Sequence, residues 1–250
     1  MLILRKMMKK TFITLEKTVS TNTFMLEMPE HERVDVVVCA REQSGGKGMG
    51  SNVWESAPGL NLTFSMGADM SFMKAANQFL LSQAVPLGLL DVLDTMLSGE
   101  VFVKWPNDIV IDGRKLCGIL INSTIRGLEM GVSVIGIGLN VNQMSFQNWP
   151  THPVSLKMLL GREVALEPLL HLLVDAVEHR IEMLRSPEGV AKIKKDYLDR
   201  LYRNRIWADY EVAGQKVKLL MTGIDSFGRL ETLDESGKSR IFDIKEIKFL

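Results

Sequence analysis

A lysine, an asparagine and an aspartate stand close together where two apolar runs meet. The stretch Lys104-Trp105-Pro106-Asn107-Asp108 follows Val101–Val103 and precedes Ile109–Ile111, and both runs predict short strands. Pro106 lacks an N–H and disfavours helical geometry at Trp105, so the stretch is expected to be extended or turned. A lysine ammonium on such a rigid backbone suits a site that brings two anions together. The alternative is an ordinary strand end, with an exposed lysine and an Asn-Asp turn.

A second segment combines glycines with a single charge. Gln43-Ser44-Gly45-Gly46-Lys47-Gly48-Met49-Gly50-Ser51-Asn52-Val53-Trp54 has four glycines within six positions, which allow positive φ angles and close approach to a ligand. It follows the predicted strand 34–40, but no helical pattern follows it and the Walker spacing is absent, which argues against a P-loop or dinucleotide turn. The pattern favours a mobile flap over a small ligand. A flexible surface hairpin is the alternative.

A third segment, Ile135-Gly136-Ile137-Gly138-Leu139-Asn140-Val141-Asn142, places glycines at alternate positions of a predicted strand. Glycine weakens a strand, so this spacing indicates that something flat lies against the glycine face. Asn140 and Asn142 are expected on the same side, where they could hydrogen-bond a purine or a ribose. Lys115 and Gly118, on the strand after Lys104, are expected to face the same region. Tight strand–strand packing is the alternative.

Composition excludes several classes of protein. The 250 residues are 46% apolar and 24% charged, as in a soluble globular protein, and 30 basic residues balance 30 acidic ones, so no global field attracts nucleic acid or anionic membrane. None of the four histidines has a partner at a spacing that predicts a metal site or a catalytic triad. Cys39 and Cys117 lie in apolar runs and predict buried thiols, which favours a reducing cytoplasm. The basic start, Met1–Lys10, has no apolar region after it, so no secretory signal is predicted, and no run approaches the length of a membrane span.

The order of patterns along the chain predicts a mixed α+β domain followed by a small β-rich part. Strand patterns alternate with helical ones, and a long helix is expected over 79–97 with Pro86 near a kink. Helical periodicity continues over 164–202 with a break at Pro187, and Arg126-Gly127 is expected to turn a hairpin. Beyond residue 204, short strands and turns are spaced like a small antiparallel barrel. We therefore predict two domains, residues 1–203 and 204–250.

These motifs together resemble one family, the biotin protein ligases, over nearly the whole chain. The family's Lys-Trp-Pro-Asn-Asp stands unaltered at Lys104–Asp108. The other matches are Ser20-Thr21-Asn22, the glycine loop Gly46–Ser51 ahead of Trp54, Lys115-Leu116-Cys117-Gly118-Ile119-Leu120, Gly136–Asn140, and a tail with Gly223-Ile224-Asp225 and Gly228-Arg229-Leu230 like the family's SH3-like domain. Two residues depart from the pattern, because Lys47 replaces an arginine and Ser51 replaces a glycine.

The resemblance implies a fold and a reaction. The fold is a mixed β-sheet with helices, like class II aminoacyl-tRNA synthetases and biotin ligases, plus a small C-terminal SH3-like β-barrel. The reaction is the ATP-dependent attachment of biotin to a lysine of biotin carboxyl carrier domains, through biotinyl-AMP, with Mg²⁺ on the phosphates. It implies carrier domains of biotin-dependent carboxylases as partners and a cytoplasmic enzyme. No specific nucleic acid, no membrane and no protein metal ligands are expected, and a homodimer is left open.

The resemblance also assigns roles to residues. Lys104 is the catalytic residue, in contact with both the biotin carboxylate and the α-phosphate. Biotin contacts are assigned to Ser20, Thr21, Asn22, Gln43, Gly46, Lys47, Gly118, Gly136 and Gly138. Contacts with ATP or the adenylate are assigned to Lys47, Gly48, Met49, Trp54, Lys104, Asn107, Lys115 and Asn140.

Three other functions were weighed against this one. A lipoate–protein ligase-like enzyme also makes an acyl-adenylate, but the unaltered Lys104–Asp108 stretch and the glycine loop favour biotin. A biotin-sensing repressor needs an N-terminal helix-turn-helix, for which a Ser-Thr-Asn motif at residue 20 leaves no room. A non-catalytic binding module would be expected to lack Lys104, which is present.

Overall fold

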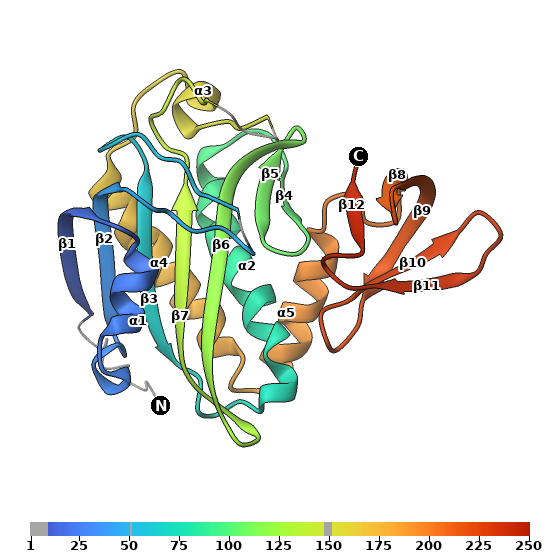
Figure 1. The fold of residues 1–250 in the computed structure, drawn as a ribbon, viewed down its shortest axis with the longest axis horizontal. Helices are drawn as coiled ribbons and strands as arrows, with labels where there is room; N and C mark the ends of the chain where they lie inside the picture. Colours follow the sequence, from blue (N-terminus) through green and yellow to red (C-terminus); the bar gives the residue numbers. More distant parts are fainter. Residues whose placement is uncertain (1–9, 51, 148–151) are drawn as a thin grey trace. The chain divides into compact units, whose positions relative to one another are not determined.

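The computed structural model describes residues 10–50, 52–147 and 152–250, which fall into two compact units. The first unit runs to Phe72 and resumes at Leu116–Leu170, and the second comprises Met73–Lys115 and His171–Leu250. Seven strands form a mixed sheet in the order β1-β2-β3-β7-β6-β5-β4, and five form an antiparallel sheet in the order β11-β10-β9-β8-β12 (Figure 1). The predicted class, a mixed sheet with helices and a C-terminal β-sheet, is confirmed. The predicted domain boundary at residue 203 stays a prediction.

The first unit contains most of the mixed sheet. The only parallel pair among its described strands is β1–β2, and β2–β3, β3–β7 and β6–β7 are antiparallel. Its elements are β1 (Thr11–Thr18), α1 (Thr21–Glu27), η1 (Glu30–Glu32), β2 (Val36–Gln43), β3 (Leu62–Asp69), β6 (Arg114–Arg126, whose first two residues belong to the second unit), β7 (Glu129–Leu139) and α3 (Leu156–Leu160). The predicted hairpin is present, with Gly127 at φ +63° between β6 and β7.

Helix α1 packs its apolar side on this sheet. Ser20 caps its first turn, because the Ser20 hydroxyl accepts a hydrogen bond from the Thr23 N–H. Met25 is fully buried with Val36, Val38 and Val134, and Ile13, Leu15, Phe24 and Met28 pack around this cluster. The cap and the cluster together hold the polar first turn of α1 over the middle of β7.

The second unit contains two strands of the mixed sheet, three helices and the five-stranded sheet. Its elements are η2 (Ala75–Asn77), α2 (Phe79–Met96), β4 (Val101–Lys104), β5 (Asp108–Ile111), most of α4 (Leu166–Met183), α5 (Pro187–Asp199), β8 (Trp207–Val212), β9 (Gln215–Ile224), β10 (Leu230–Asp234), β11 (Ser239–Phe242) and β12 (Ile247–Phe249). Pro86 lies inside α2, which is assigned as one helix, and Pro187 is the first residue of α5 after the N-cap Ser186. Both helices therefore occur where the periodicity predicted them.

Helix α2 corrects one expectation. Within the described part of the chain it is the one helix long and apolar enough to cross a membrane by length and composition, with a mean hydropathy of 1.3. Most of it, 61%, is buried inside the protein, which is the state of a core helix. The expectation that no run approaches the length of a membrane span was therefore wrong. The apolar residues of α2 are explained by their packing inside the protein.

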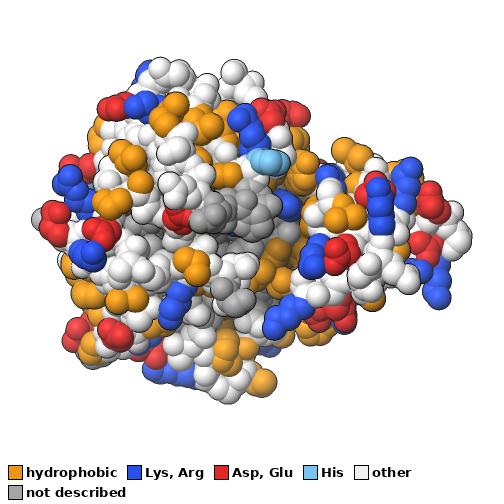
Figure 2. Space-filling view, turned by 45° about the horizontal axis from the view of Figure 1, so that its top comes forward, with side chains coloured by type: hydrophobic (Ala, Val, Ile, Leu, Met, Phe, Trp, Pro, Cys, Tyr) orange, Lys and Arg blue, Asp and Glu red, His pale blue; other side chains and the backbone are white. Residues whose placement is uncertain are grey.

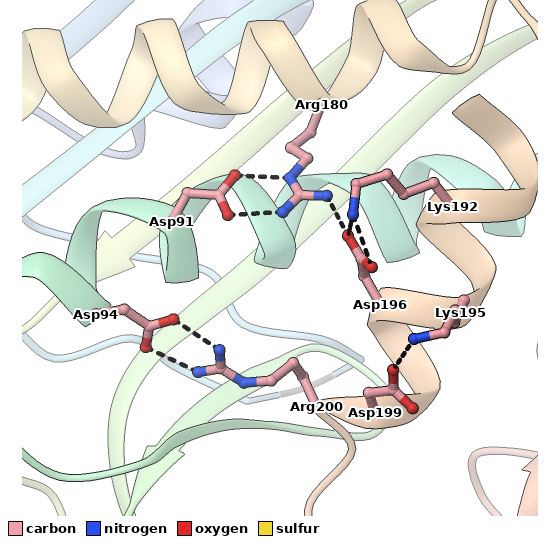
Figure 3. A network of polar contacts seen from close by, with 8 residues as sticks. All are labelled: Asp91, Asp94, Arg180, Lys192, Lys195, Asp196, Asp199 and Arg200. Carbon is pink, nitrogen blue, oxygen red and sulfur yellow. Dashed lines mark hydrogen bonds and ion pairs between the residues drawn. The ribbon is translucent and has the colours of Figure 1, made fainter. Parts of the chain in front are cut away.

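Charged side chains of both signs are interspersed over the face shown in Figure 2, in keeping with the equal numbers of basic and acidic residues. Figure 3 shows a network of ion pairs that involves α2, α4 and α5 of the second unit. Arg180 of α4 donates two hydrogen bonds to the Asp91 carboxylate of α2, each 2.6 Å long, and one of 2.7 Å to Asp196 of α5. The Arg180 side chain is only 12% exposed, so these bonds replace most of its water. One guanidinium thus ties three helices together.

Replacing Arg180 with methionine should destabilise the protein. Methionine keeps much of the apolar stem but leaves the Asp91 and Asp196 carboxylates without the guanidinium, so we expect the free energy of unfolding to fall by about 1.5–3 kcal/mol. Urea denaturation followed by circular dichroism measures this change.

The matched control is Lys195→Met. Lys195 forms a single ion pair with Asp199 on the surface of α5, and both side chains are well exposed, so its loss should leave the denaturation midpoint almost unchanged. Equal midpoints for Arg180→Met and wild type would show that the three-helix contact contributes nothing.

Candidate active site

Lys104 ends a strand and faces its partner across a three-residue turn. β4 and β5 form a hairpin in which Lys104 pairs with Asp108, and Trp105-Pro106-Asn107 makes the turn, with a cis peptide bond before Pro106. The far edge of β4 is also occupied, because the Val103 N–H donates to the Arg200 carbonyl and the Tyr202 N–H donates to the Val103 carbonyl. The predicted strand–turn–strand is confirmed, and it holds Lys104 on a backbone bonded from both sides.

The Lys104 ammonium is partly buried and surrounded by charge. Burial lowers its pKa from the ordinary lysine value, the Asp108 carboxylate opposes that shift, and the positive charges of Arg203 and Lys115 add to it. Lys115 lies 2.7 Å from Asp108 in an ion pair. Because the pKa of Lys104 is lower in the folded than in the unfolded chain, the unfolded chain binds this proton first as pH falls, so the charge costs stability at neutral pH. A negatively charged ligand at Lys104 would offset this cost.

The turn after Lys104 is anchored by the C-terminal sheet. The Trp105 ring N–H donates a buried hydrogen bond of 2.9 Å to the Gly228 carbonyl, 123 residues away. Gly228 has φ +87°, and a Cβ there would lie 2.3 Å from the Phe79 ring, so only glycine fits. Sequence reasoning assigned no role to Trp105 or Phe79, because neither motif spacing nor periodicity reports a contact this far along the chain.

A polar cluster occupies the first turn of α1 in the first unit. The Gln43 side-chain carbonyl accepts a 2.8 Å hydrogen bond from the Thr21 N–H, and the Thr21 hydroxyl lies 2.9 Å from that of Ser65. Asn122 donates to the Asn22 side-chain carbonyl at 2.9 Å. The structure therefore brings Thr21, Asn22 and Gln43 together beside the N-cap Ser20 and adds Ser65 and Asn122, and the contacts of this cluster with biotin stay a prediction. Amides and hydroxyls of this kind match a ligand with both N–H donors and a carbonyl.

The glycines of β7 allow this cluster and an aromatic ring to approach the sheet. A Cβ on Gly136 would lie 2.9 Å from the Asn22 amide nitrogen, and one on Gly138 would lie 2.4 Å from the Trp54 indole. Gly138 stands opposite Gly118 of β6, so the sheet has two adjacent positions without side chains there. The sequence predicted a flat group against this face, and the group at Gly138 is the buried indole of Trp54.

The glycine-rich segment forms a short hairpin. Lys47 and Val53 make an antiparallel bridge, the Gly48 N–H donates to the Asn52 carbonyl, and the Trp54 N–H donates to the Gly46 carbonyl. Lys47 and Val53 are exposed, whereas Gly46 and Trp54 are buried at its base. Gly48 and Met49 lie in the partly buried arm, and Ser51, the second departure from the family pattern, lies outside the described residues. The surface-hairpin geometry is present, and mobility of the segment stays a prediction.

Asn140 and Asn142 are engaged with the backbone of the following segments. β7 ends at Leu139, so the alternation that placed both residues on the glycine side does not extend to them. Asn140 is fully buried and donates to the Val154 carbonyl at 3.1 Å, and Asn142 exchanges two hydrogen bonds with Val164. The adenylate contact of Asn140 stays a prediction.

The predicted site residues thus fall into two groups, each within one unit. The first unit holds the polar cluster, the glycine hairpin, Trp54, Gly118, Gly136, Gly138 and Asn140, and the second holds Lys104, Asn107 and Lys115. Within the described part of the chain, no cluster of three or more His, Cys, Asp or Glu side chains could hold a metal ion.

Comparison with known proteins gives the same assignment as the motifs. The biotin/lipoate A/B protein ligase family matches residues 14–140, just over half of the chain. A biotin–[acetyl-CoA-carboxylase] ligase of Paracoccus denitrificans is 28% identical over 229 residues, which cover 89% of this chain and 90% of that protein. The fold is similar to that of a biotin protein ligase from Aquifex aeolicus in complex with biotin and ATP, with a TM-score of 0.79 and 19% identity. The alignment covers 96% of this chain and 99% of that chain. A Leishmania major biotin protein ligase in complex with biotinyl-5-AMP has a TM-score of 0.60 at 19% identity, and the alignment covers 93% of this chain and 98% of that chain.

The chain belongs to the biotin/lipoate A/B protein ligase family. Within that family, the relative from Paracoccus denitrificans and both structural neighbours are biotin ligases.

Adding a methyl group at Gly138 should displace Trp54. Gly138→Ala places a Cβ where the indole now lies, so we expect Trp54 to move towards water and the free energy of unfolding to fall by about 1–3 kcal/mol. The tryptophan emission should shift to longer wavelength, and the difference should vanish when both proteins also carry Trp54→Phe.

Gly99→Ala is the control, because its Cβ meets only the end of the flexible Ile111 side chain, at 3.2 Å. An emission spectrum of Gly138→Ala identical to that of wild type would contradict the packing described here.

Proposed function

We propose that this chain is a biotin protein ligase, which uses ATP to attach biotin to a lysine of a carboxyl carrier domain. The observation that carries the proposal is Lys104, a partly buried ammonium held between two hydrogen-bonded backbones at the end of β4. Family membership and the biotin ligases among the relatives support it.

In the first step, a carboxylate oxygen of biotin attacks the α-phosphorus of ATP. The new carbon–oxygen–phosphorus link forms as the bond from the α-phosphorus to the bridging oxygen breaks, and pyrophosphate leaves with the electron pair. The barrier is largely repulsion between a carboxylate and a triphosphate, so positioning and positive charge supply most of the catalysis. Lys104 is the group proposed to contact both anions, and the rigid β4–β5 turn keeps its ammonium in place.

In the second step, the amine of the carrier lysine attacks the carbonyl carbon of biotinyl-AMP. An amide bond forms, AMP leaves with the bridging oxygen, and the amine loses a proton. Until the amine arrives, water must be kept from the anhydride. The hairpin with Lys47, Gly48 and Met49 is proposed to cover it, with Gly46 at the base of the hairpin.

Biotin is assigned to the polar cluster at the first turn of α1. Its ureido ring has two N–H donors and one carbonyl, which match Ser20, Thr21, Asn22 and Gln43. The backbone at Gly118, Gly136 and Gly138 is assigned to the same side, where the absence of side chains lets Asn22 and the Trp54 indole lie on the sheet beside the ligand. Trp54, Asn107, Lys115 and Asn140 are assigned to ATP or the adenylate, with Lys104.

Mg²⁺ is proposed as the partner of the phosphates. Among the described residues no three His, Cys, Asp or Glu side chains cluster, and Mg²⁺ commonly keeps several waters and binds substrate phosphates, so the chain's residues are compatible with it. When bound, Mg²⁺ would neutralise phosphate charge, and Lys104 and Lys115 would provide the protein's own positive charge.

The cellular setting is also part of the proposal. Cys39 and Cys117 are free thiols, which supports a reducing cytoplasm. Burial raises the pKa of Cys39 to about 11, which keeps this thiol protonated and poorly reactive at neutral pH. Carrier domains of biotin-dependent carboxylases are the proposed partners, without a specific nucleic acid or a membrane. Light scattering distinguishes a monomer from a homodimer.

Biotin- and ATP-dependent release of pyrophosphate from the purified protein tests the function. Lipoate in place of biotin is the discriminating arm, because the family includes ligases for both acids. We expect pyrophosphate release with biotin and none with lipoate. Release with lipoate and none with biotin would show that lipoate is the substrate.

Lys104→Ala should nearly abolish biotinyl-AMP formation and weaken biotin binding much less. Its charge is needed most where the two anions meet, so we expect a loss of about 10²–10³-fold in the rate of adenylation. Single-turnover kinetics measures the rate, and calorimetric titration with biotin alone measures binding.

Lys218→Ala, at an exposed position of β9, controls for the loss of one positive charge and should adenylate like wild type. A Lys104→Ala enzyme within a few-fold of wild type would remove Lys104 from the catalytic role.

The glycine hairpin should become protected when ligand binds. Most of its described residues, in 44–50 and 52–53, are exposed or half-buried, so hydrogen exchange there should slow when biotin or biotinyl-AMP is added. The amides of Val37 and Val38, inside β2, serve as an internal reference that should not change. Equal exchange of the hairpin in both states would rule out a closing flap.

A further inference from the structure

The C-terminal strand β12 brings an aromatic ring to the lysine on which the proposed reaction depends. Phe249, the last residue of β12, lies beneath the Lys104 ammonium, with the nitrogen 5.2 Å from the ring centroid. A cation within about 6 Å of a ring face is attracted by the negative face of the ring, and the attraction grows when water is excluded. Lys104 is partly desolvated, so this is a contact of the stronger kind.

Two tyrosine rings pack against the Phe249 ring. Phe249 packs edge-on against Tyr210, at 5.1 Å between centroids, and is stacked with Tyr202 at 6.5 Å. Tyr202 in turn donates its N–H to the Val103 carbonyl, one residue before Lys104. We call Tyr202, Tyr210 and Phe249 the tail cluster. Strand β4 and the tail cluster are therefore linked through the backbone as well as through the ring.

The end of the chain is anchored where it leaves the cluster. β12 pairs with β8, with Phe249 opposite Tyr210, and the Leu250 N–H donates to the Asp209 carbonyl. Arg203 donates a 2.7 Å hydrogen bond to the Leu250 carbonyl and stacks over the Tyr202 ring. These bonds restrain the position of Phe249.

We propose that Phe249 is a positioning residue for Lys104, and that its ring restrains the ammonium in the place where the two anions meet. A lysine side chain has four rotatable bonds, and fixing them when the transition state forms would slow the reaction. The ring face removes part of that freedom before the reaction. A carboxylate would also restrain the ammonium but would neutralise its charge, whereas the ring does not. This inference rests on the proposed function of Lys104.

A test must distinguish the effect of the aromatic ring face from the effect of the side chain's volume. Phe249→Leu keeps an apolar side chain of similar size and removes the ring, whereas Phe249→Tyr keeps the ring. We expect Phe249→Leu to lower the single-turnover rate of adenylation about three- to tenfold, with the KM for biotin changed by less than about twofold, and Phe249→Tyr to restore the rate.

Phe227→Leu is the matched control, because Phe227 is an exposed ring in the same sheet region with a cation, Arg229, 5.4 Å from its centroid. Its replacement should leave the rate unchanged. If Phe249→Leu does not fold, trifluorophenylalanine at position 249 is the second variant. It keeps the shape of the ring and lowers the negative charge on its face, so a fall in the adenylation rate is also expected.

A second readout needs no activity. In protein labelled with ¹³C at the lysine side chains, the Lys104 signal, identified by its loss in Lys104→Arg, should show the upfield shift caused by a ring face. Phe249→Leu should abolish this shift, and Phe249→Tyr and Phe227→Leu should retain it. A Lys104 signal that is the same in wild type and Phe249→Leu would overturn the contact.

The two readouts separate the inference from the proposed function. A wild-type protein that releases no pyrophosphate with biotin and ATP would overturn the function, and the nuclear magnetic resonance measurement would still test the contact. A lost shift with an unchanged rate of adenylation in an active enzyme would overturn the positioning role alone.

Discussion

The rest of this structure depends on the cost of holding one ammonium partly out of water. Burial lowers the pKa of Lys104, and its surroundings include two further cations, Arg203 and Lys115. Such a group stays charged and ordered only if its backbone is rigid and some partner stabilises it. β5 on one side of β4, the 200–202 segment on the other and the Trp105–Gly228 hydrogen bond provide the rigidity. Asp108 and the Phe249 ring provide the stabilisation.

A second constraint operates in the first unit, where polar groups must reach the centre of a sheet. Glycines at 136 and 138 remove the side chains that would block them, so Asn22 and the Trp54 indole lie directly on β7. The Thr21 and Ser65 hydroxyls lie within hydrogen-bond distance of each other there, and the Asn122 amide donates to the Asn22 side-chain carbonyl. Under the proposed function, biotin would replace these bonds, and selectivity would depend on how well it reproduces their geometry.

Local chemistry made part of this predictable from the sequence. Pro106 disfavours a helix, so the strand–turn–strand around Lys104 follows from its immediate neighbours, and alternate glycines imply a flat group because only close approach justifies them. Ser65 was missed for a physical reason. It alternates with apolar residues as on a half-exposed strand, yet β3 lies between β2 and β7 and is buried on both faces. The alternation also failed beyond Leu139, where β7 ends and Asn140 turns to the backbone of the next segment.

The contacts that sequence reasoning could not reach are those that join distant segments. Phe249 lies 145 positions beyond Lys104, and Gly228 lies 123 beyond Trp105, so no period or spacing connects them. Both contacts arise because segments of the C-terminal sheet return to the β4–β5 hairpin of the same unit. The five-stranded sheet is thus coupled to Lys104 through the Phe249 ring and the Gly228 carbonyl. Both contacts require that the sheet keep a fixed position beside the β4–β5 hairpin. A substitution that loosens β12, or that displaces the Gly228 carbonyl, therefore acts on Lys104 without touching a ligand, which makes the C-terminal sheet part of the support of the site.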